Sequence, residues 1–244
     1  MKIIDVSKHN GIINWSKVAA HDVKGVIIRA GYGRYISQKD KTFEQNYFGA
    51  KMAGLNVGAY WYSYAETPAE AKQEAAVFLE SIKGKTFDMP VYFDIEEPKH
   101  VKIGKAMCTA ITSAFCAEVE KAGYFVGIYS FDSFFTTNLD KAVSDRYSKW
   151  VARIGSKPVT NCDMWQYEWE GKINGINYDT DINICYKDFP RIIKNAGLNG
   201  YGYVPTYNVS AVVNGIDKTK ADKIAAECSK LGMTVILKED KNAR

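Results

Sequence analysis

The apolar residues of this chain gather into short continuous runs, and these runs alternate with stretches in which apolar residues recur three and four positions apart. A continuous run of about four to eight apolar residues is typical of a strand buried on both faces, whereas the second spacing is typical of an amphipathic helix. The pattern predicts strands at residues 2–6, 25–30, 56–65, 90–96, 124–130, 149–154, 163–167 and 180–184.

Helical spacing fills the gaps between the earlier strands. Gly54 and Gly123 directly follow two of these segments, as C-terminal capping glycines do, and Pro68 stands in the first turn of a third. The expected helices are residues 13–21, 43–53, 68–82, 105–122 and 139–146. Repeated strand–helix units predict a parallel sheet, so we expect an α/β barrel that is closed by eight strands and loses most of its helices in the last third.

The C-terminal region departs from this pattern. Residues 195–205 are rich in glycine and tyrosine, which predicts a linker. Beyond them we expect a strand at 206–213, a helix at 217–231 and a strand at 233–238. The predicted organisation is therefore a barrel domain of residues 1–194, a linker and a small β-α-β module of residues 206–244.

Composition and motifs disfavour several classes of protein. The net charge of +4 is spread along the chain without a basic block, so no nucleic-acid partner is expected. No apolar run is long enough for a membrane span. The five cysteines have no metal-ligand spacing, and no metal-hydrolase or phosphate-loop motif is present, so we expect free thiols, no metal and no cofactor. The first strand starts at residue 2, which leaves no room for a signal peptide.

Acidic residues stand where the predicted strands end. The carboxyl ends of the strands of such a barrel meet at one rim. Asp94 and Glu96 close the fourth strand on the same face, because strand side chains alternate with a period of two. Asp5 ends the first strand, and Asp179 and Asp181 lie at the last one. A helix cap at Asp94 and a solvated Glu96 form the alternative interpretation of the central pair.

Paired carboxylates beside aromatic residues, without a Ser/His/Asp order, indicate cleavage of a glycosidic bond. One negative charge raises the pKa of its neighbour and keeps that neighbour protonated. Because the side chain of Glu96 is longer, we predict Glu96 as general acid and Asp94 as its electrostatic or nucleophilic partner, with Asp5 and Asp181 around them. Aromatic candidates for sugar contacts, each of which could instead be barrel core, are Tyr60, Tyr62, Tyr129 and Trp165.

Residues 1 to about 190 resemble the lysozymes of glycoside hydrolase family 25, which include many phage endolysins. The resemblance rests on landmarks in family order, namely Ile4-Asp5-Val6-Ser7, Gly25–Gly31, Asp40-Lys41-Thr42-Phe43, Gly54-Leu55-Asn56-Val57-Gly58-Ala59-Tyr60, Phe93-Asp94-Ile95-Glu96, Gly127-Ile128-Tyr129, Trp150-Val151-Ala152, Trp165-Gln166-Tyr167 and Asp181-Ile182-Asn183. One position departs from the family, because Trp61 stands where many relatives carry a histidine.

The resemblance implies a barrel of (β/α)5 units followed by three further strands. It also implies hydrolysis of the β-1,4 bond between N-acetylmuramic acid and N-acetylglucosamine in bacterial peptidoglycan. The family's acid would be Glu96, its companion Asp94 and its other site aspartates Asp5 and Asp181, in preference to Asp179. A neighbouring-group route through the substrate's acetamido group would make Asp94 a stabiliser of that group.

Two alternatives remain at this point: a catalytically silent glycan-binding barrel, and a hydrolase of another amino-sugar polymer such as chitin. The expected lack of a signal peptide fits a phage enzyme stored in the host cytoplasm and released when the membrane is breached, and equally a bacterial enzyme within a prophage remnant. The module of residues 206–244 is similar to half of a sporulation-related-repeat module that binds peptidoglycan. We expect it to bind cell wall, to self-associate with a second copy, to complete a larger module or to pack on the barrel.

Overall fold

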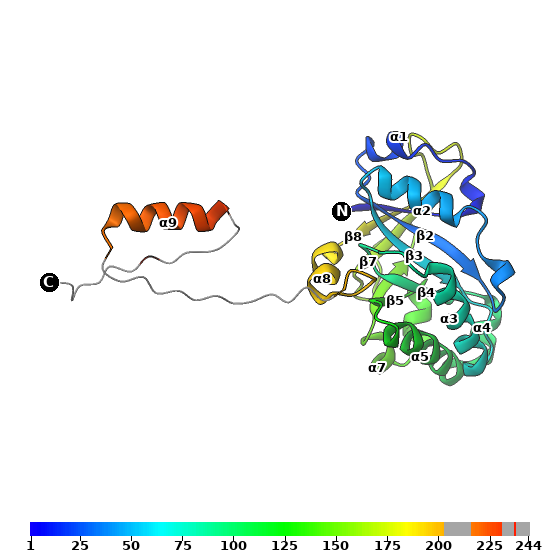
Figure 1. Cartoon of the computed structure of the whole chain (residues 1–244). Helices are drawn as coiled ribbons and strands as arrows, with labels where there is room; N and C mark the ends of the chain where they lie inside the picture. The colour runs from blue at the N-terminus through cyan, green and yellow to red at the C-terminus, as the bar shows by residue number, and fades with distance from the viewer. Residues whose placement is uncertain (203–215, 231–236, 238–244) are drawn as a thin grey trace. The chain divides into compact units, whose positions relative to one another are not determined.

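The computed structural model describes residues 1–202, 216–230 and 237. The chain divides into two compact units, Met1–Val204 and Pro205–Arg244. The first unit is a closed barrel in which the strands follow one another in sequence order, and helices cover its outer face (Figure 1). This arrangement confirms the predicted α/β barrel.

The first seven strands of the described barrel run parallel to one another, and the eighth is antiparallel to both of its neighbours. The strands are β1 (Lys2–Val6), β2 (Gly25–Tyr32), β3 (Asn56–Tyr62), β4 (Val91–Asp94), β5 (Val126–Phe131), β6 (Ser148–Ala152), β7 (Met164–Gly171) and β8 (Thr180–Cys185). Because only a short loop joins β7 to β8, β8 must return in the opposite direction. The prediction of a parallel sheet is therefore wrong for β8.

The helices of the first unit are α1 (Trp15–Ala19), α2 (Phe43–Met52), α3 (Pro68–Ile82), α4 (Pro98–Ile103), α5 (Lys105–Lys121), α6 (Asp132–Thr137), α7 (Lys141–Ser144) and α8 (Phe189–Ala196), with 3-10 turns at Lys8–Asn10 and Ile36–Gln38. The expected helices do not include α4, α6 or α8. α4 and α6 have six residues each, too few to show a clear apolar period, whereas α8 does carry apolar residues at helical spacing, namely Phe189, Ile192, Ile193 and Ala196. Pro98 opens α4, so this proline both ends the extended segment and begins a helix.

Aromatic side chains fill the interior of the barrel. The ring centroids of Tyr92, Tyr129 and Tyr60 lie 5.1, 4.4 and 6.1 Å from that of Trp150. Trp150 is buried, so the interior of the barrel is filled by side chains and is not an open channel. This packed layer lies beneath the carboxyl rim. Trp61 points the other way, where its ring lies 5.6 Å from Phe78 of α3, so the departure from the family falls in the layer between sheet and helices.

The residues after α8 close the opposite end of the barrel. Asn199 is fully buried, and its amide donates to the carbonyls of Phe87 (3.2 Å) and Met89 (2.9 Å) and accepts from the backbone N–H of Phe125 (2.7 Å). The hydroxyl of Tyr201 donates to Asp88. The first part of the segment expected as a linker is therefore packed against the barrel.

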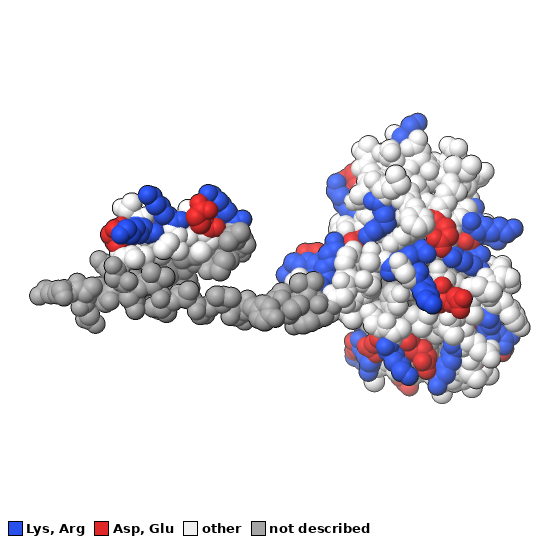
Figure 2. Space-filling view, viewed as in Figure 1, with Lys and Arg blue, Asp and Glu red and all other residues white. Residues whose placement is uncertain are grey.

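In the second unit the structure describes the helix α9 (Lys218–Lys230), which agrees with the helix expected at 217–231. The two strands expected around it, 206–213 and 233–238, lie outside the described residues. None of the described helices combines the length and apolar character needed to cross a membrane. Basic and acidic side chains are interspersed on the face of the first unit that Figure 2 shows.

Candidate active site

The central acids lie where β4 leaves the barrel. β4 ends at Asp94, two residues earlier than expected, although its pairing continues through the backbone for one more residue. The N–H of Ser63 donates to the carbonyl of Asp94 (2.9 Å), and the N–H of Ile95 donates to the carbonyl of Tyr129 (3.1 Å). Glu96 then lies in the short loop that leads into α4, so it stands above the rim while Asp94 lies within it.

Asp5 and Asp181 face each other across the antiparallel pair of β1 and β8, and a hydrogen bond joins their side chains. The Oδ2 atom of Asp5 also accepts from the amides of Asn183 (2.8 Å) and Gln166 (3.0 Å). Burial raises the pKa of Asp5, and these hydrogen bonds lower it in part. Burial and the nearby charge of Asp5 raise the pKa of Asp181 to about 9, so the pair holds one proton at neutral pH.

Asp94 is only 3% exposed, and its Oδ1 atom is buried without a hydrogen-bond partner among the described residues. Burial raises its pKa well above the usual range, and the charges of Glu96 and Asp5 raise it further. For Glu96, burial and the charges of Asp5 and Glu97 raise the pKa to about 7. A carboxyl with such a pKa can hold and release a proton near neutral pH, as a general acid must.

Three of the predicted aromatic residues lie with these acids. The hydroxyl of Tyr129 donates to Oε1 of Gln166 (2.7 Å), and that of Tyr62 donates to Oε1 of Glu97 (2.7 Å). Burial raises the pKa of the Tyr60 hydroxyl, and the charges of the rim acids raise it further, which reflects their proximity. The structure therefore brings Tyr60, Tyr62 and Tyr129 to the same rim as the acids.

Trp165 is not brought to this rim. On β7 the buried Met164 and Gln166 point into the barrel, so the alternation of the strand turns Trp165 outward. Its indole donates to the carbonyl of Arg153 (2.8 Å). Trp169, which is 49% exposed, is linked to the acids through Gln166. Its indole donates to Oε1 of Gln166 (3.1 Å), and Nε2 of Gln166 donates to Asp5.

Sequence reasoning missed several groups around the acids. Two of them carried a signal in the sequence. Asn183 lies two residues after Asp181 and therefore on the same face of the strand, and Gln166 belongs to the Trp-Gln-Tyr landmark. Arg29 on β2 had no such signal. Its guanidinium binds Asp40 (2.9 Å), and its positive charge lowers the pKa of Asp94.

The described part of the chain contains no group of three or more His, Cys, Asp or Glu side chains arranged to hold a metal ion. Its cysteines are free thiols. The polar groups described around the acids are amides, tyrosine hydroxyls and one guanidinium.

Comparison with known proteins gives a consistent picture. A sequence model of the family described as "Glycosyl hydrolases family 25" matches residues 4–176. The chain is 30% identical to the autolytic lysozyme of Clostridium acetobutylicum over 188 residues, which cover 75% of this chain and 55% of that protein.

Two solved structures are also similar. The modular autolysin LytC of Streptococcus pneumoniae has a TM-score of 0.68 and 30% identity, with 75% of this chain and 46% of that chain covered. The CTP1L endolysin has a TM-score of 0.71 and 28% identity, with 99% and 84% covered. The chain thus spans about half the length of the autolytic lysozyme and of LytC.

Proposed function

Because the chain belongs to the glycosyl hydrolases family 25, we propose that it is a muramidase that cleaves bacterial peptidoglycan between N-acetylmuramic acid and N-acetylglucosamine. The observation that carries the proposal is the cluster of Asp5, Asp94, Glu96 and Asp181 at the carboxyl end of the barrel. Within it Glu96 has a pKa of about 7, which suits an acid that protonates a leaving oxygen.

In the proposed first step, Glu96 donates its proton to the glycosidic oxygen as the bond from that oxygen to the anomeric carbon breaks. The carbonyl oxygen of the substrate's own acetamido group forms a new bond to this carbon. The Oδ1 atom of Asp94, which has no hydrogen-bond partner among the described residues, can accept the acetamido N–H. This contact orients the group and stabilises the positive charge that develops on it.

In the second step a water molecule attacks the anomeric carbon, and the Glu96 carboxylate takes its proton. The acetamido group is thereby released, and Glu96 returns to its protonated form. Asp5 and Asp181, which hold one proton between them, keep a negative charge beside Glu96 that supports its raised pKa. Tyr60, Tyr62 and Tyr129 supply aromatic faces and hydroxyls to the bound sugars.

The choice of substrate draws on the relatives. LytC has been solved in complex with a synthetic peptidoglycan ligand, and we carry this substrate class over to the present chain. The proposed target is therefore the glycan strand of the bacterial wall.

Analysis of reducing ends tests the proposal. Purified peptidoglycan is digested with the protein, the new ends are reduced with borohydride, and the amino sugars are identified after hydrolysis. We expect new ends on muramic acid, none after digestion with the Glu96→Gln protein and none from chitin oligomers. New ends on glucosamine alone, or no new ends, would overturn the proposal.

A further inference from the structure

Three tyrosines form an aromatic surface that leads away from the acids, which we call the tyrosine shelf (Tyr32, Tyr62 and Tyr64). The ring of Tyr64 lies 5.3 Å from that of Tyr62 and 5.9 Å from that of Tyr32. At its inner edge, the hydroxyl of Tyr62 binds Glu97, the neighbour of Glu96. At its outer edge, Tyr64 is 40% exposed. The shelf thus connects the acids to the protein surface.

The backbone of Tyr64 is held on both sides by buried or partly buried side chains. Its N–H donates to Oε1 of Glu74 (2.8 Å), and its carbonyl accepts from Nζ of Lys99 (2.7 Å). The preceding Ser63 donates its N–H to the carbonyl of Asp94. The position of Tyr64 is therefore tied directly to the strand that carries the central acid.

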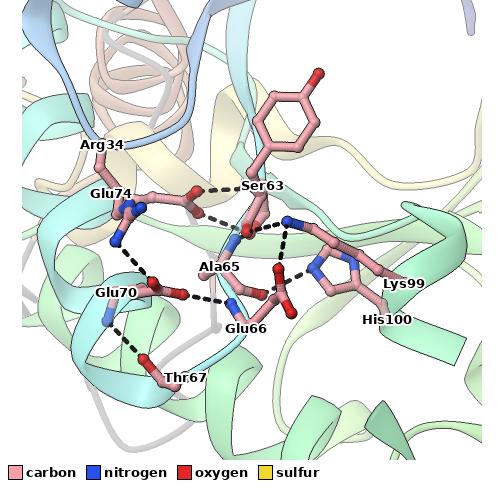
Figure 3. A network of polar contacts seen from close by, with 10 residues as sticks. Arg34, Ser63, Ala65, Glu66, Thr67, Glu70, Glu74, Lys99 and His100 are labelled. Carbon is pink, nitrogen blue, oxygen red and sulfur yellow. Dashed lines mark hydrogen bonds and ion pairs between the residues drawn. The ribbon is translucent and has the colours of Figure 1, made fainter. Parts of the chain in front are cut away.

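A larger network fixes the rest of this loop, as Figure 3 shows. The hydroxyl of Ser63 donates to Oε2 of Glu74 (2.6 Å), and Nε2 of His100 donates to the carbonyl of Ala65 (2.9 Å). The N–H of Glu66 donates to Glu70 (2.7 Å), which in turn binds Arg34 (2.6 Å). Residues from α3, α4 and the loop after β2 therefore converge on the segment 63–66.

Glu74 is the centre of this network and is fully buried. It makes no ion pair with any described residue, so its two oxygens are satisfied by a hydroxyl and a backbone N–H alone. Burial raises its pKa to about 7. Placing a carboxyl there is costly, which indicates that a fixed position of the loop matters to the protein.

Stability alone does not explain this arrangement, because the ring that the loop presents remains substantially exposed. A fixed, half-exposed tyrosine suits ligand binding, since little conformational freedom is lost when a ligand docks. Its flat apolar face and polar edge match a sugar ring, which has the same combination of surfaces. Tyr62 lies between Tyr64 and the acids, so the reacting sugars can bind nearer to Glu96 than the sugar on Tyr64.

We propose that the tyrosine shelf binds a further sugar of the glycan strand, outside the pair whose bond is cut, and that Glu74 positions Tyr64 for this contact. The inference rests on the proposed muramidase function and extends its binding site. It assigns Tyr64 and Tyr32 to substrate binding and Glu74 to a positioning role.

The first experiment measures binding, so it does not depend on catalysis. Long glycan strands freed of stem peptides are titrated into the Glu96→Gln protein with and without Tyr64→Ala. We expect Tyr64→Ala to weaken binding roughly three- to tenfold, the range of one aromatic contact, and Tyr64→Trp to retain binding. Tyr186→Ala is the matched control, because Tyr186 is 52% exposed and follows β8 at the opposite end of the barrel.

The second experiment uses the active protein. On long strands Tyr64→Ala should raise KM by a similar factor with little change in kcat, whereas on the shortest cleavable fragment, which cannot reach the shelf, the variant and the parent should agree. Glu74→Ala should raise KM like Tyr64→Ala, and Glu74→Gln should restore it, because its amide oxygen still accepts the N–H of Tyr64. A role in folding alone would lower the melting temperature and leave KM unchanged.

Equal binding of peptide-free strands by the Tyr64→Ala and Tyr64 proteins would overturn the proposal. A loss of binding seen only when stem peptides are present would also overturn it, because the shelf would then contact peptide. A wild-type protein that binds strands through Tyr64 but forms no muramic acid ends would refute the muramidase function and leave the shelf standing.

Discussion

Two groups of buried carboxylates in this barrel have opposite properties. The rim acids (Asp5, Asp94, Glu96 and Asp181) have raised pKa values. The paired acids (Asp40, Asp88 and Asp132) have lowered pKa values. Burial raises the pKa in both groups, so burial does not account for the difference.

The difference lies in what surrounds each carboxylate. Asp132 accepts from the backbone N–H groups of Val159 (2.9 Å) and Thr160 (3.0 Å) and pairs with Arg153 (2.6 Å). Asp88 pairs with Lys51 (2.8 Å) and Lys194 (3.1 Å). By contrast, no ion pair joins the rim acids to a cation in the described part of the chain.

The comparison shows how the same residue type serves two purposes. A carboxylate with several donors and a cation stays ionised and holds loops or helices in place. A carboxyl group that is buried near other carboxylates and has no paired cation has a raised pKa, and for Glu96 this pKa of about 7 lies in the range that acid–base chemistry requires.

Loss of the proposed acid should have the largest effect. Glu96→Gln removes the exchangeable proton while keeping the shape of the side chain, so we expect kcat on peptidoglycan to fall about 10³-fold or more. Wall-lysis rates together with melting temperatures measure this. The control is Glu97→Gln, since Glu97 has the same side chain one residue on and binds Tyr62; an equal loss there would contradict the assignment.

Asp94→Asn should separate activity from stability. Activity should fall about 10²-fold, because the charge that stabilises the acetamido group is removed. The melting temperature at pH 8 should match or exceed that of the parent, because the folded protein disfavours the charged form of Asp94. Calorimetry gives the melting temperature; a marked decrease would place Asp94 with the paired acids.

Asp88→Asn should show the reverse behaviour. It leaves Lys51 and Lys194 without their counter-ion, so the free energy of unfolding should fall by roughly 2–3 kcal/mol while kcat is unchanged. Urea unfolding and wall-lysis assays on the same samples provide the measurement. A loss of kcat in the fully folded variant would break the distinction between the two groups.

Titration of Glu74 should make the free energy of unfolding depend on pH. Its pKa rises from 4.5 to about 7 on folding, so the folded state binds more protons between these values. Stability from this group is thus present below about pH 4.5 and is lost as pH rises through 7. Relative to Glu74→Gln, the parent should lose roughly 2–3 kcal/mol between pH 5 and pH 8 in urea unfolding. Parallel curves for the two proteins would show that Glu74 does not titrate there.

Asp5→Asn tests the coupling within the rim acids and should give the smallest shift. The charge of Asp5 raises the pKa of Glu96, so its removal should move the alkaline limb of the kcat/KM profile, expected near pH 7 for the parent, to lower pH. The profile on soluble glycan fragments measures this shift. An alkaline limb that stays in place would mean that Glu96 is not the group that controls it.

Much of the fold could be predicted because the signals are local. Buried runs and helical spacing lie within single segments, and the expected helix at 68–82 agrees with α3. Apart from α8, the errors fall where local signals are weak. The short helices α4, α6 and α8 were missed, the expected helix at 139–146 is reduced to α7, and the strand expected at 90–96 ends at Asp94.

The candidate site shows the same division. The positions of the strand ends predict Asp94 and the tyrosines at one rim, whereas the alternation of β7 turns Trp165 away from it. Trp169 has the same parity as Trp165, but the register of β7 shifts after Gln166, and the indole of Trp169 reaches Gln166.

The sequence by itself predicted which acids lie near the strand ends, because strand alternation and the position of each strand end are properties of short segments. Only the tertiary structure decided what those acids can do. The pKa of Glu96 depends on Asp5, which is 91 residues away in the sequence, and the charge of Asp5 is held by Gln166 and Asn183 from β7 and β8. Burial and Coulomb interactions act through space, so no local pattern contains them.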